Sequence, residues 1–592
     1  MKFQLINKPN ENYSAIKQVL INRGLKEKEI EHYLNLSDLD INEPECFNKE
    51  LLDKASDVLY NTINNNLDIC VIVDADCDGY TSSAILINYL YDINSDFVEN
   101  HIHWYMHEGK QHGLSDCMDW IEDINPALVI VPDAGSNDSK QLQELEDKKI
   151  KVIILDHHEV EQLEFWTTMF HPYLYLINSQ SPNYPNKELS GAGVVWQFCK
   201  YLDKKWDKNY ADWYLDLTAL GLDGDMMSLK SPETRWLIFK GLKTENIHNP
   251  FIYEMWQKNK FKLGDELTAW GVTFYIVPFV NAITRSGTLE EKELIFNSML
   301  KFKALQEILS NKRGHKLGEK ERLVEQAIRT CTNVKNRQGR SETAGLELVE
   351  HLIKDNNMME HKVLLFLLEP GQVKAEIRGL IANKLMAKYQ RPCCMLTRTE
   401  KDGAISYQGS ARGCDKVGVT EFKDICAATG IADYVAGHQG AFGIGLPADK
   451  IDAFVKATDE SLKNMASEPT YYVDYIWNQN EADAKSILEI AEMDKYWGKD
   501  MEEALVAVQG IQVTKSMLTM MASNTCKITL PNGIAMIKFK MSDEEFDKLY
   551  SENGYVEINV VAKCNRNEWN GNVSAQLMIE NYEIVNECAY IF

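Results

Sequence analysis

Three short apolar runs in the first third of the chain each end directly before an acidic residue or one position from it. The runs cover residues 69–73, 127–131 and 152–155, and helix-like segments separate them. Every residue within a run is apolar, which is typical of parallel strands buried on both faces. In sheets of this kind, ligands bind at the carboxyl ends of the strands. The sequence therefore predicts an α/β fold with acidic side chains gathered along one edge of a parallel sheet.

The first acidic cluster follows residues 69–73 and contains Asp74, Asp76 and Asp78. Three carboxylates within five residues repel one another unless a cation binds them, and oxygen ligands suit Mg²⁺ and Mn²⁺. A calcium-binding EF-hand loop starts in a similar way, but it needs a glutamate at its twelfth position, where this chain has Ile85. We therefore expect a Mg²⁺ or Mn²⁺ site. A solvated acidic turn is the alternative.

Further candidate ligands follow the other apolar runs. Asp133 comes after the second run, Asp156 follows the third run and leads into His157 and His158, and Asp225 lies in a glycine-rich segment. Imidazole is a common metal ligand, and a second histidine can serve as an acid or a phosphate contact. Taken singly, a lone Asp after a strand is usually a helix N-cap and a histidine pair is usually a surface feature. Their shared position after apolar runs favours one common site.

The acidic motifs also occur in a recognisable order. A DxDxDG motif comes first, then a single Asp, then Asp-His-His, and finally an Asp in a glycine-rich turn. This order resembles that of the DHH phosphoesterases. The similarity extends over about residues 56–592 to the RecJ-type exonucleases of that superfamily. It is carried by segments 189–194, 215–221, 278–285, 377–382, 437–438 and 567–571.

The resemblance implies an α/β protein with several domains. It predicts a parallel-sheet DHH domain, a long connector helix, a smaller α/β DHHA1 domain and a C-terminal all-β OB-like domain. A chain of 592 residues is long enough for several cores. We place a helical lead-in before these domains and an acidic helix at the start of the last one. The expected boundaries are 1–55 for the lead-in, 56–300 for DHH, 301–345 for the connector, 346–465 for DHHA1 and 466–592 for the acidic helix and OB-like domain.

The resemblance further implies a hydrolase that uses two divalent cations, Mn²⁺ or Mg²⁺. The expected reaction is 5′→3′ hydrolysis of single-stranded DNA, in DNA recombination, repair or replication. His158 and Asp74 are the candidate catalytic residues, with Asp74 either a ligand or an orienting residue. Asp133 is expected to bridge the two cations. The implied metal ligands are Asp76, Asp78, Asp133, His157 and Asp225.

Candidate substrate contacts lie in several segments. The segment 408–413 resembles a glycine-rich phosphate-binding segment of the family, and an arginine can grip a terminal 5′-phosphate bidentately. The alternative for this arginine is a pair with a surface acid. Trp569 is a candidate platform for a base, and an ordinary buried tryptophan is the alternative. The implied contacts are Ser410, Arg412, His438, Arg285, Asn281 and His107.

The chain also departs from the family pattern at several positions. His107 stands where the family has an arginine, Phe279 replaces another arginine, and Ala436 replaces a glycine. We therefore expect some phosphate contacts to be remodelled, as in a divergent copy carried by a mobile element.

Charge is distributed unevenly along the chain. The formal net charge is −25, which is unusual for a nucleic-acid-binding protein. Residues 301–340, however, hold eleven Lys or Arg against four Asp or Glu, whereas residues 474–503 are strongly acidic. Binding depends on the local potential, so the total charge does not exclude a polyanionic substrate.

The remaining composition bounds location and partners. The thirteen cysteines form no CxxC pair, which indicates reduced thiols, and no apolar run could span a bilayer. The start lacks the apolar stretch of a signal peptide. We therefore expect a cytoplasmic monomer without membrane contact. Its expected partner is single-stranded DNA with a 5′-phosphate end, and a single-strand-binding protein or a helicase is a candidate protein partner.

Two other functions remain open at this point. One is a DHH/DHHA1 phosphodiesterase that acts on short oligonucleotides or cyclic dinucleotides. Such enzymes typically lack the extra β domain and the basic connector. The other is an inactive DHH scaffold that binds a replication partner, although an inactive copy need not keep the full ligand set.

Overall fold

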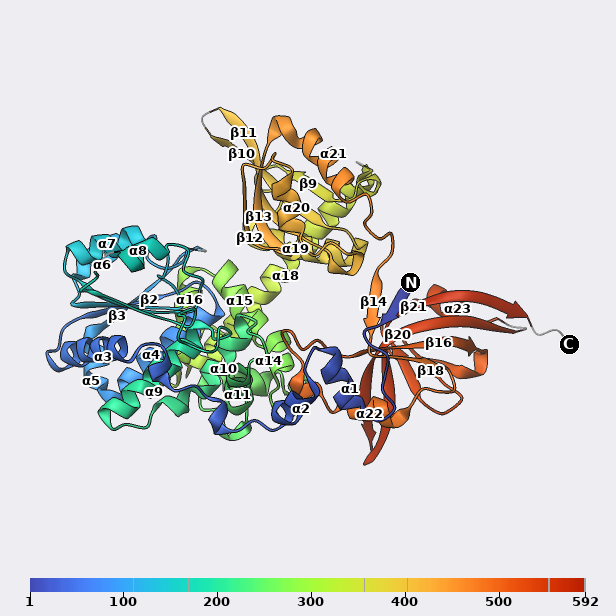
Figure 1. Ribbon diagram of the computed structural model, residues 1–592, viewed down its shortest axis with the longest axis horizontal. Coiled ribbons are helices and arrows are strands. Elements are labelled where there is room, and N and C mark those ends of the chain that lie inside the picture. Colours follow the sequence, from blue (N-terminus) through green and yellow to red (C-terminus); the bar gives the residue numbers. More distant parts are fainter. Residues whose placement is uncertain (110, 169, 356, 402, 552–553, 590–592) are drawn as a thin grey trace. The chain divides into compact units, whose positions relative to one another are not determined.

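The chain folds into two compact units in the computed structural model, which describes residues 1–589 apart from 110, 169, 356, 402 and 552–553 (Figure 1). The larger unit consists of residues 26–336 and 494–503. The smaller unit consists of residues 1–25, 337–493 and 504–592. Both units therefore combine segments that are distant in the sequence.

A five-stranded sheet forms the centre of the larger unit. Every neighbouring pair of its strands is parallel. This confirms the prediction made from the three apolar runs. In sheet order, the strands are β3 (Ile102–Met106), β2 (Ile69–Val73), β4 (Leu128–Pro132), β5 (Lys151–Asp156) and β6 (Leu174–Asn178).

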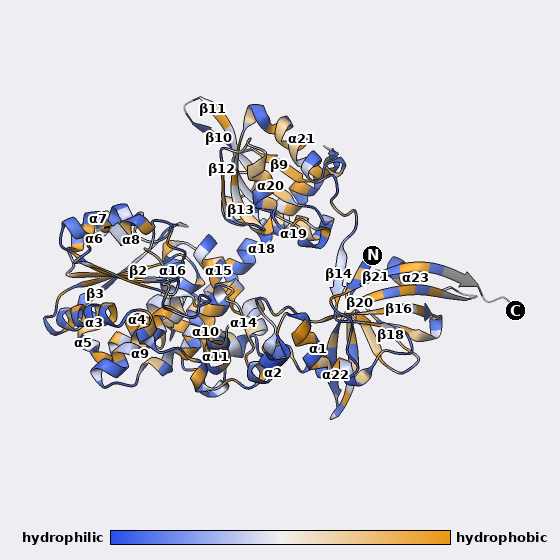
Figure 2. Ribbon diagram, viewed as in Figure 1, coloured by the Kyte–Doolittle hydropathy of each residue, from blue (hydrophilic) through white to orange (hydrophobic). Residues whose placement is uncertain are grey.

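Helices cover both faces of this sheet, and its strands are largely in the hydrophobic colours (Figure 2). On one face, Cys70 and Ile72 of β2 pack with Leu142 and Leu145. The alternate residues of β2 are buried on the other face. Burial on both faces explains why each run is apolar throughout. The helices are α6 (Met118–Ile124), α7 (Ser139–Asp147) and α8 (Leu163–Thr168) on one face, and α3 (Lys49–Asn64), α4 (Cys77–Ile93) and α9 (Gly191–Trp206) on the other.

The rest of the larger unit is mainly helical. Helix α10 packs against α4, α9 and α11. The returning segment 494–503 is joined to this unit by a hydrogen bond from the Leu229 backbone N–H to the Lys499 carbonyl oxygen, at 3.1 Å. The remaining α-helices are α2 (Glu27–Leu34), α5 (Ser95–His101), α10 (Leu215–Gly224), α11 (Pro232–Gly241), α12 (Pro250–Lys258), α13 (Lys260–Leu263), α14 (Ala269–Tyr275), α15 (Val277–Ser286), α16 (Leu289–Met299) and α17 (Lys301–Ala304).

The connector differs from the predicted helix over residues 301–345. Its first part contains α17 and an antiparallel hairpin of β7 (Glu307–Leu309) and β8 (Lys320–Arg322). The helix α18 begins only at Leu323 and runs to Asp355. Gly314 and Gly318 have φ angles of 83° and 81°, which a right-handed helix cannot contain. These two glycines explain why the basic segment turns back on itself before the helix starts.

The smaller unit contains a five-stranded mixed sheet within residues 346–465. Apolar side chains pack on both of its faces. The predicted strands at 363–368 and 393–396 are confirmed. In sheet order, the strands are β12 (Tyr434–His438), β13 (Ala441–Pro447), β11 (Ala404–Arg412), β10 (Cys393–Lys401) and β9 (Leu364–Leu368), with helices α19 (Ala375–Tyr389), α20 (Phe422–Ala428) and α21 (Ile451–Ser461).

A seven-stranded sheet forms the C-terminal part of the smaller unit. The predicted hairpin turns at 532–533 and 570–571 connect β18 to β19 and β20 to β21, and both pairs are antiparallel. In sheet order, the strands are β15 (Tyr475–Asn478), β16 (Leu505–Val513), β20 (Gly554–Trp569), β21 (Asn572–Ala589), β19 (Ala535–Lys538), β18 (Thr525–Thr529) and β17 (Leu518–Met521), with the short helix α23 (Asp543–Asp547).

Two predicted helical regions are partly wrong. The N-terminal lead-in starts with a strand, β1 (Lys2–Leu5), before α1 (Ala15–Asn22), and β1 pairs in parallel with β14 (Thr470–Val473). The acidic region 474–503 contains strand β15, and α22 (Ala484–Ala491) is its only α-helix within the described chain. Both strands are four residues long, which is too short for a clear periodic signal.

The described cysteines and helices agree with the composition. Twelve of the thirteen cysteines have described side chains, and all twelve are free thiols. Among the described residues, no helix is long and apolar enough to cross a membrane.

Candidate metal centre and phosphate-binding residues

The carboxyl edge of the five-stranded sheet gathers the predicted acidic motifs. Two groups of three side chains have ligand atoms within 4.8 Å of one another. The first group is Asp74, Asp76 and Asp133, and the second is Asp133, His157 and His158. Because Asp133 belongs to both groups, the geometry agrees with the expectation that it bridges two cations.

Asp133 occupies an unusual position at the end of β4. Its backbone has a φ of 65°, and its side chain is buried. The Oδ1 atom has no hydrogen-bond partner, although it lies 3.2 Å from Nε2 of His157. Burial and the neighbouring charge of Asp78 raise the pKa of Asp133 well above its ordinary value. A buried carboxylate oxygen without a partner is costly, so this residue fits a bound cation.

His157 and Asp225 lie beside Asp133. The Nε2 atom of His157 is 3.4 Å from Oδ2 of Asp225. Burial lowers the pKa of His157, which favours the neutral imidazole that metals bind. Burial and the negative charges of Asp78 and Asp76 raise the pKa of Asp225 to about 8. The fourth acidic motif therefore joins the same cluster, as the sequence predicted.

The first acidic motif supplies Asp74 and Asp76. Asp76 caps α4 by accepting a hydrogen bond from the Gly79 N–H at 2.9 Å. Burial and the charges of Asp74 and Asp78 raise the pKa of Asp76 to about 6. Asp74 accepts hydrogen bonds from the Gly113 N–H at 3.0 Å and pairs with Nδ1 of His112 at 2.7 Å.

His112 is a functional residue that the sequence reasoning did not assign. The bond to Asp74 raises the pKa of His112, and its side chain is 64% exposed. It therefore combines an anchored Nδ1 with access to solvent beside the metal cluster. Its place in the segment 111–114, which matches a family motif, was the available signal.

Asp78 has a different environment from the other predicted ligands. It accepts hydrogen bonds from the Ser190 hydroxyl at 2.8 Å, the Gly191 N–H at 2.5 Å and the Ala192 N–H at 3.1 Å. A carboxylate has about four lone-pair sites, so these donors leave about one for a metal. Asp78 thus holds the N-terminus of α9 against α4 at the metal cluster. Its predicted role as a ligand stays a prediction.

Asp156 orients the second histidine of the DHH motif. Its Oδ1 lies 2.8 Å from Nδ1 of His158, and its Oδ2 accepts a hydrogen bond from the Ser136 N–H at 3.0 Å. Burial opposes the charged form of His158, but the hydrogen bond and charge of Asp156 raise its pKa to about 9. His158 is also half exposed, so it presents a protonated imidazole to solvent at neutral pH.

Two glycines permit the close packing of this centre. A Cβ atom added at Gly191 would lie 2.5 Å from both Cβ and Oδ1 of Asp133. A Cβ added at Gly221 would lie 2.3 Å from Oδ1 of Asp78. Real Cβ atoms essentially never approach so closely, so larger residues at these positions would displace the acidic side chains.

The structure does not place His107 where a phosphate contact would have to lie. Its side chain is fully buried, and its Nδ1 lies 2.6 Å from Oδ1 of Asp116. The neighbouring carbonyl oxygens of residues 107 and 108 accept hydrogen bonds from the buried ammonium of Lys292, at 3.0 and 2.7 Å. His107 therefore stabilises the loop after β3, and its predicted phosphate contact is wrong in this structure because the imidazole has no access to solvent.

Asn281 and Arg285 lie on α15. They are four residues apart, so they share one face of the helix. Arg285 is exposed and Asn281 is half-buried, and α15 packs against α4 and α10, which begin and end at the acidic motifs. Their assignment to the substrate stays a prediction.

The other predicted substrate contacts lie on the mixed sheet of the smaller unit. Ser410 and Arg412 are two residues apart on β11, so they share a face. Arg412 and His438 are both paired with Ala441 of β13, one from each side. Cross-strand partners project to the same face. The sheet therefore gathers Ser410, Arg412 and His438 on one face.

Helix α19 adds two residues to this face. A Cβ added at Gly379 would lie 2.5 Å from Nη2 of Arg412 and 3.8 Å from Oγ of Ser410, so the first turn of α19 lies directly over them. Arg378 donates from Nη1 to the Thr397 hydroxyl at 3.0 Å and to the Gln408 carbonyl oxygen at 3.1 Å. Arg378 was part of a matched family segment, but it was not assigned a role from the sequence.

Comparison with known proteins decides the family. A profile of the DHH family, N-terminal domain, matches residues 68–222, and a profile of the RecJ OB domain matches residues 473–581. The YorK protein of the SPbeta prophage in Bacillus subtilis, whose name describes a single-strand DNA-specific exonuclease, is 30% identical over 590 residues. The match covers 99% of this chain and 98% of YorK. The chain belongs to the RecJ-like family of DHH phosphoesterases.

Other RecJ-like proteins extend this comparison. The single-stranded-DNA-specific exonuclease RecJ of Bacillus subtilis is 24% identical over 581 residues, which cover 96% of this chain and 67% of that protein. The crystal structure of Thermus thermophilus RecJ in complex with Mn²⁺ has a TM-score of 0.69 at 18% identity and covers 97% of this chain and 76% of that one. The RecJ-like fold, with its DHH sheet and OB domain, is therefore confirmed.

The raised pKa values of this RecJ-like centre predict a pH-dependent stability. In EDTA, the free energy of unfolding should fall as the pH rises from about 4 to about 8. Unfolded aspartates titrate near 3.9, whereas Asp76 and Asp225 titrate at about 6 and about 8 in the folded chain. Between these values the folded chain keeps protons that the unfolded chain has lost, so this stability is present below pH 4 and is lost as the pH rises.

Thermal unfolding with EDTA and with Mn²⁺ measures this effect. Because ligands must lose protons to bind a metal, Mn²⁺ should raise the melting temperature more at pH 8 than at pH 6. Asp225→Asn should flatten the pH dependence in EDTA, while Asp96→Asn, which alters an exposed acid outside the cluster, should not. A Mn²⁺ shift at pH 6 that equals the shift at pH 8 would contradict the prediction.

Proposed function

We propose that this chain is a single-stranded-DNA-specific exonuclease that acts 5′→3′ by a two-metal mechanism. The observation that carries the proposal is the shared position of Asp133 in two ligand groups, with one buried oxygen left without a hydrogen bond. We propose a role in DNA recombination, repair or replication. The full-length match to YorK, whose name describes a single-strand DNA-specific exonuclease, supports the substrate class.

The side chains divide between two cation positions. We assign Asp74 and Asp76 to one Mn²⁺ or Mg²⁺, His157 and Asp225 to the other, and Asp133 to both. The Thermus thermophilus RecJ structures in complex with Mn²⁺ and with Mg²⁺ support this choice of cation. A bound pair of such cations supplies an activated water and a counter-charge for the leaving oxygen.

The residues around the cations position the scissile phosphate. Asp156 holds Nδ1 of His158, which leaves the Nε2–H of the protonated imidazole to donate to a phosphate oxygen. Asp78 fixes the N-terminus of α9, and Gly191 lets this terminus approach Asp133 closely. The exposed imidazole of His112 can contact a neighbouring phosphate while its Nδ1 holds Asp74.

A surface for single strands is available on the seven-stranded sheet. Trp569 lies at the turn between β20 and β21 and is 73% exposed, so the alternative of a buried tryptophan is wrong. Exposed aromatic side chains on OB-type folds stack against bases. This position supports a polymeric substrate over a dinucleotide, because a dinucleotide has few bases to stack on a separate sheet.

The face around Arg412 is the proposed pocket for the 5′-phosphate. A terminal monoester carries more charge than an internal diester, so Arg412 should favour a strand end. The wild type should degrade 5′-phosphorylated strands faster than 5′-hydroxyl strands, and Arg412→Ala should lose this preference. A hydrogen bond to a charged group corresponds to a factor of roughly 10 to 100. The measurement compares initial rates on both strand ends.

The control for this experiment is Arg398→Ala. Arg398 lies on β10 and alternates with Thr397, so it projects to the face opposite Arg412. It should keep the preference of the wild type, and both variants should cleave dinucleotides normally. Equal rates on both ends in the wild type, or products released only from the 3′ end, would refute the assignment. Rapid cleavage of dinucleotides with no cleavage of long strands would instead favour the short-oligonucleotide phosphodiesterase.

A further inference from the structure

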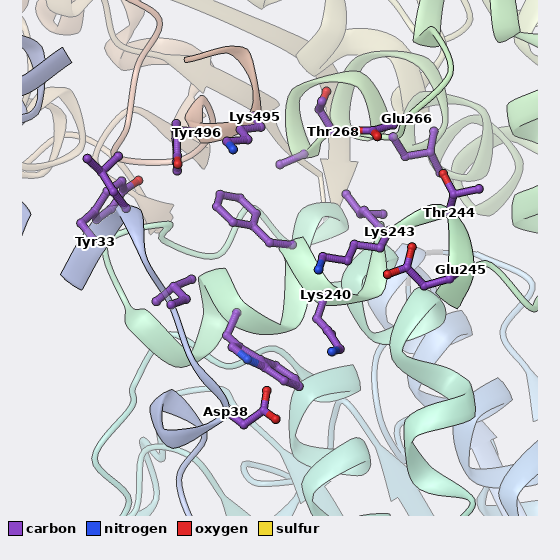
Figure 3. A pocket seen from close by; sticks show the side chains of 17 residues that line it. Tyr33, Asp38, Lys240, Lys243, Thr244, Glu245, Glu266, Thr268, Lys495 and Tyr496 are labelled. Carbon is purple, nitrogen blue, oxygen red and sulfur yellow. The ribbon is translucent and has the colours of Figure 1, made fainter. Parts of the chain in front are cut away.

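A second pocket in the larger unit shares no residue with the metal cluster. It has a volume of about 620 Å³. Three chain segments line it: residues 33–38, residues 236–269, and residues 495–496 of the returning segment (Figure 3). Pockets for small ligands usually have volumes of 300–1,000 Å³. This pocket is therefore large enough for a nucleotide, and nothing in the proposed reaction uses it.

Aromatic rings form much of the wall of this pocket. The ring centroids of Tyr33 and Tyr496 are 5.8 Å apart, and those of Phe239 and Tyr496 are 5.7 Å apart. Trp236 also lines the pocket, and both Trp236 and Phe239 are half-buried, so part of each ring remains accessible. Rings held in this way offer flat apolar surfaces on which a planar base can stack.

Three lysines line the same pocket: Lys240, Lys243 and Lys495. In the described part of the chain, none of them forms an ion pair with a carboxylate. Lys240 lies 5.8 Å from the ring centroid of Trp236, and Lys495 lies 5.1 Å from that of Tyr496. Figure 3 shows Lys240 and Lys243 near one another, with Lys495 beside Tyr496. These ammonium groups are available to an anion.

The acidic residues of the pocket decide between a small anion and a polyanion. Asp38, Glu245 and Glu266 balance the three lysines, so the charged lining has no net charge. A long nucleic-acid strand gains most of its affinity from an excess of positive charge. A neutral balance with locally unpaired lysines suits a compact ligand that carries one anionic group.

The hydroxyl of Tyr33 provides independent evidence for a ligand. Tyr33 is only 3% exposed, and its hydroxyl has no hydrogen-bond partner among the described residues. The Arg235 guanidinium lies 3.7 Å from its ring centroid. Burial raises the pKa of Tyr33 to about 12, so the hydroxyl keeps its proton. A buried donor without an acceptor is costly, and an oxygen of a ligand in the pocket would satisfy it.

We propose that this pocket binds a nucleoside 5′-monophosphate. The base stacks on Trp236 and Phe239, and the phosphate binds Lys240 and Lys243. An oxygen of the nucleotide accepts the hydrogen bond of Tyr33. The proposal rests on the proposed function for the source of the ligand, because nucleoside monophosphates are the products of an exonuclease. Binding itself is independent of hydrolysis.

Calorimetric titration of thymidine 5′-monophosphate into the full chain tests the proposal. EDTA is present, so that phosphate cannot bind through a metal at the catalytic cluster. The wild type should bind one equivalent. Trp236→Leu and Lys243→Gln should each weaken binding about tenfold, since stacking and an unpaired cation contribute comparably. Lys243 is exposed, so its variant keeps the fold even if Trp236→Leu does not.

The controls separate this site from the metal centre. Lys208→Gln, which alters another exposed lysine of the same unit, and Asp133→Asn should both bind like the wild type. Thymidine alone and inorganic phosphate alone should each bind more weakly than the nucleotide. No binding by the wild type, binding unchanged in Lys243→Gln, or binding lost in Asp133→Asn would overturn the proposal. Tighter binding of an acidic peptide than of the nucleotide would overturn it too. An inactive nuclease that still binds the nucleotide would overturn only the proposed function.

Discussion

Asp133→Asn should lower the rate of single-strand hydrolysis by roughly 10³-fold or more, because the loss of a shared ligand removes several kcal/mol of transition-state stabilisation. The substitution keeps the size of the side chain and removes only its charge. Asp133 is buried, its Oδ1 has no hydrogen bond, and the neighbouring acids repel it. In EDTA, the melting temperature of the variant should therefore equal or exceed that of the wild type at neutral pH.

Asp96→Asn is the matched control for this experiment. It makes the same chemical change on the exposed surface of the larger unit, so rate and melting temperature should both stay near the wild-type values. The measurement is the initial rate on a 5′-phosphorylated single strand with saturating Mn²⁺, together with a melting curve in EDTA. Near-normal hydrolysis by Asp133→Asn would show that the two ligand groups do not share this residue in catalysis.

Gly191→Ala should reduce hydrolysis by about 10²-fold or more without touching an ionisable group. The added Cβ would lie 2.5 Å from Cβ and Oδ1 of Asp133 and 2.7 Å from its backbone Cα. Because the nearest atoms include backbone, a side-chain rotation cannot relieve the contact, and either Asp133 or the N-terminus of α9 must move. A displacement of about 1 Å in a catalytic site can cost about 10²-fold in rate.

Gly339→Ala provides the control for this glycine. Gly339 lies inside helix α18, and a Cβ added there would meet nothing within 4 Å. Alanine has a higher helix propensity than glycine, so this variant should be as active as the wild type and slightly more stable. The measurement is the apparent Mn²⁺ affinity and the maximal rate. Equal values for Gly191→Ala and the wild type would contradict the close approach of α9 to Asp133.

The metal centre was largely predictable because the geometry of a parallel sheet is general. Asp133 and His157 are distant from Asp76 in the sequence, yet each follows a buried strand at its carboxyl end. Since these ends lie along one edge of the sheet, their convergence follows from strand order and not from any specific contact. The order of the motifs added Asp225, which follows a helix and has no strand to locate it.

The partners of individual side chains were not predictable in the same way. Asp78 faces three donors of α9, and His107 is buried against Asp116, although the motif pattern predicts roles at the substrate for both. Which donor reaches a carboxylate depends on tertiary packing, and one residue of displacement along a helix changes it. His112 shows the converse, because its bond to Asp74 depends on a loop conformation.

Long-range exchanges between segments were also beyond the sequence. The N-terminal strand β1 pairs with β14, and Arg23 forms a buried ion pair with Asp474 at 2.9 Å. Such pairings link residues more than 400 positions apart, and no local periodicity encodes them. The hairpin β7–β8 shows a further limit, because charge and helix propensity suggest a continuous helix where Gly314 and Gly318 impose turns.

The number of Mn²⁺ ions bound per chain tests the central claim most directly. Calorimetric titration of the metal-free protein at pH 8 gives this number and does not depend on the substrate. The account predicts two ions for the wild type and at most one for Asp133→Asn, since Asp133 is the one residue that belongs to both ligand groups found among the described residues. A single ion in the wild type, or two ions bound with unchanged affinity in Asp133→Asn, would contradict it.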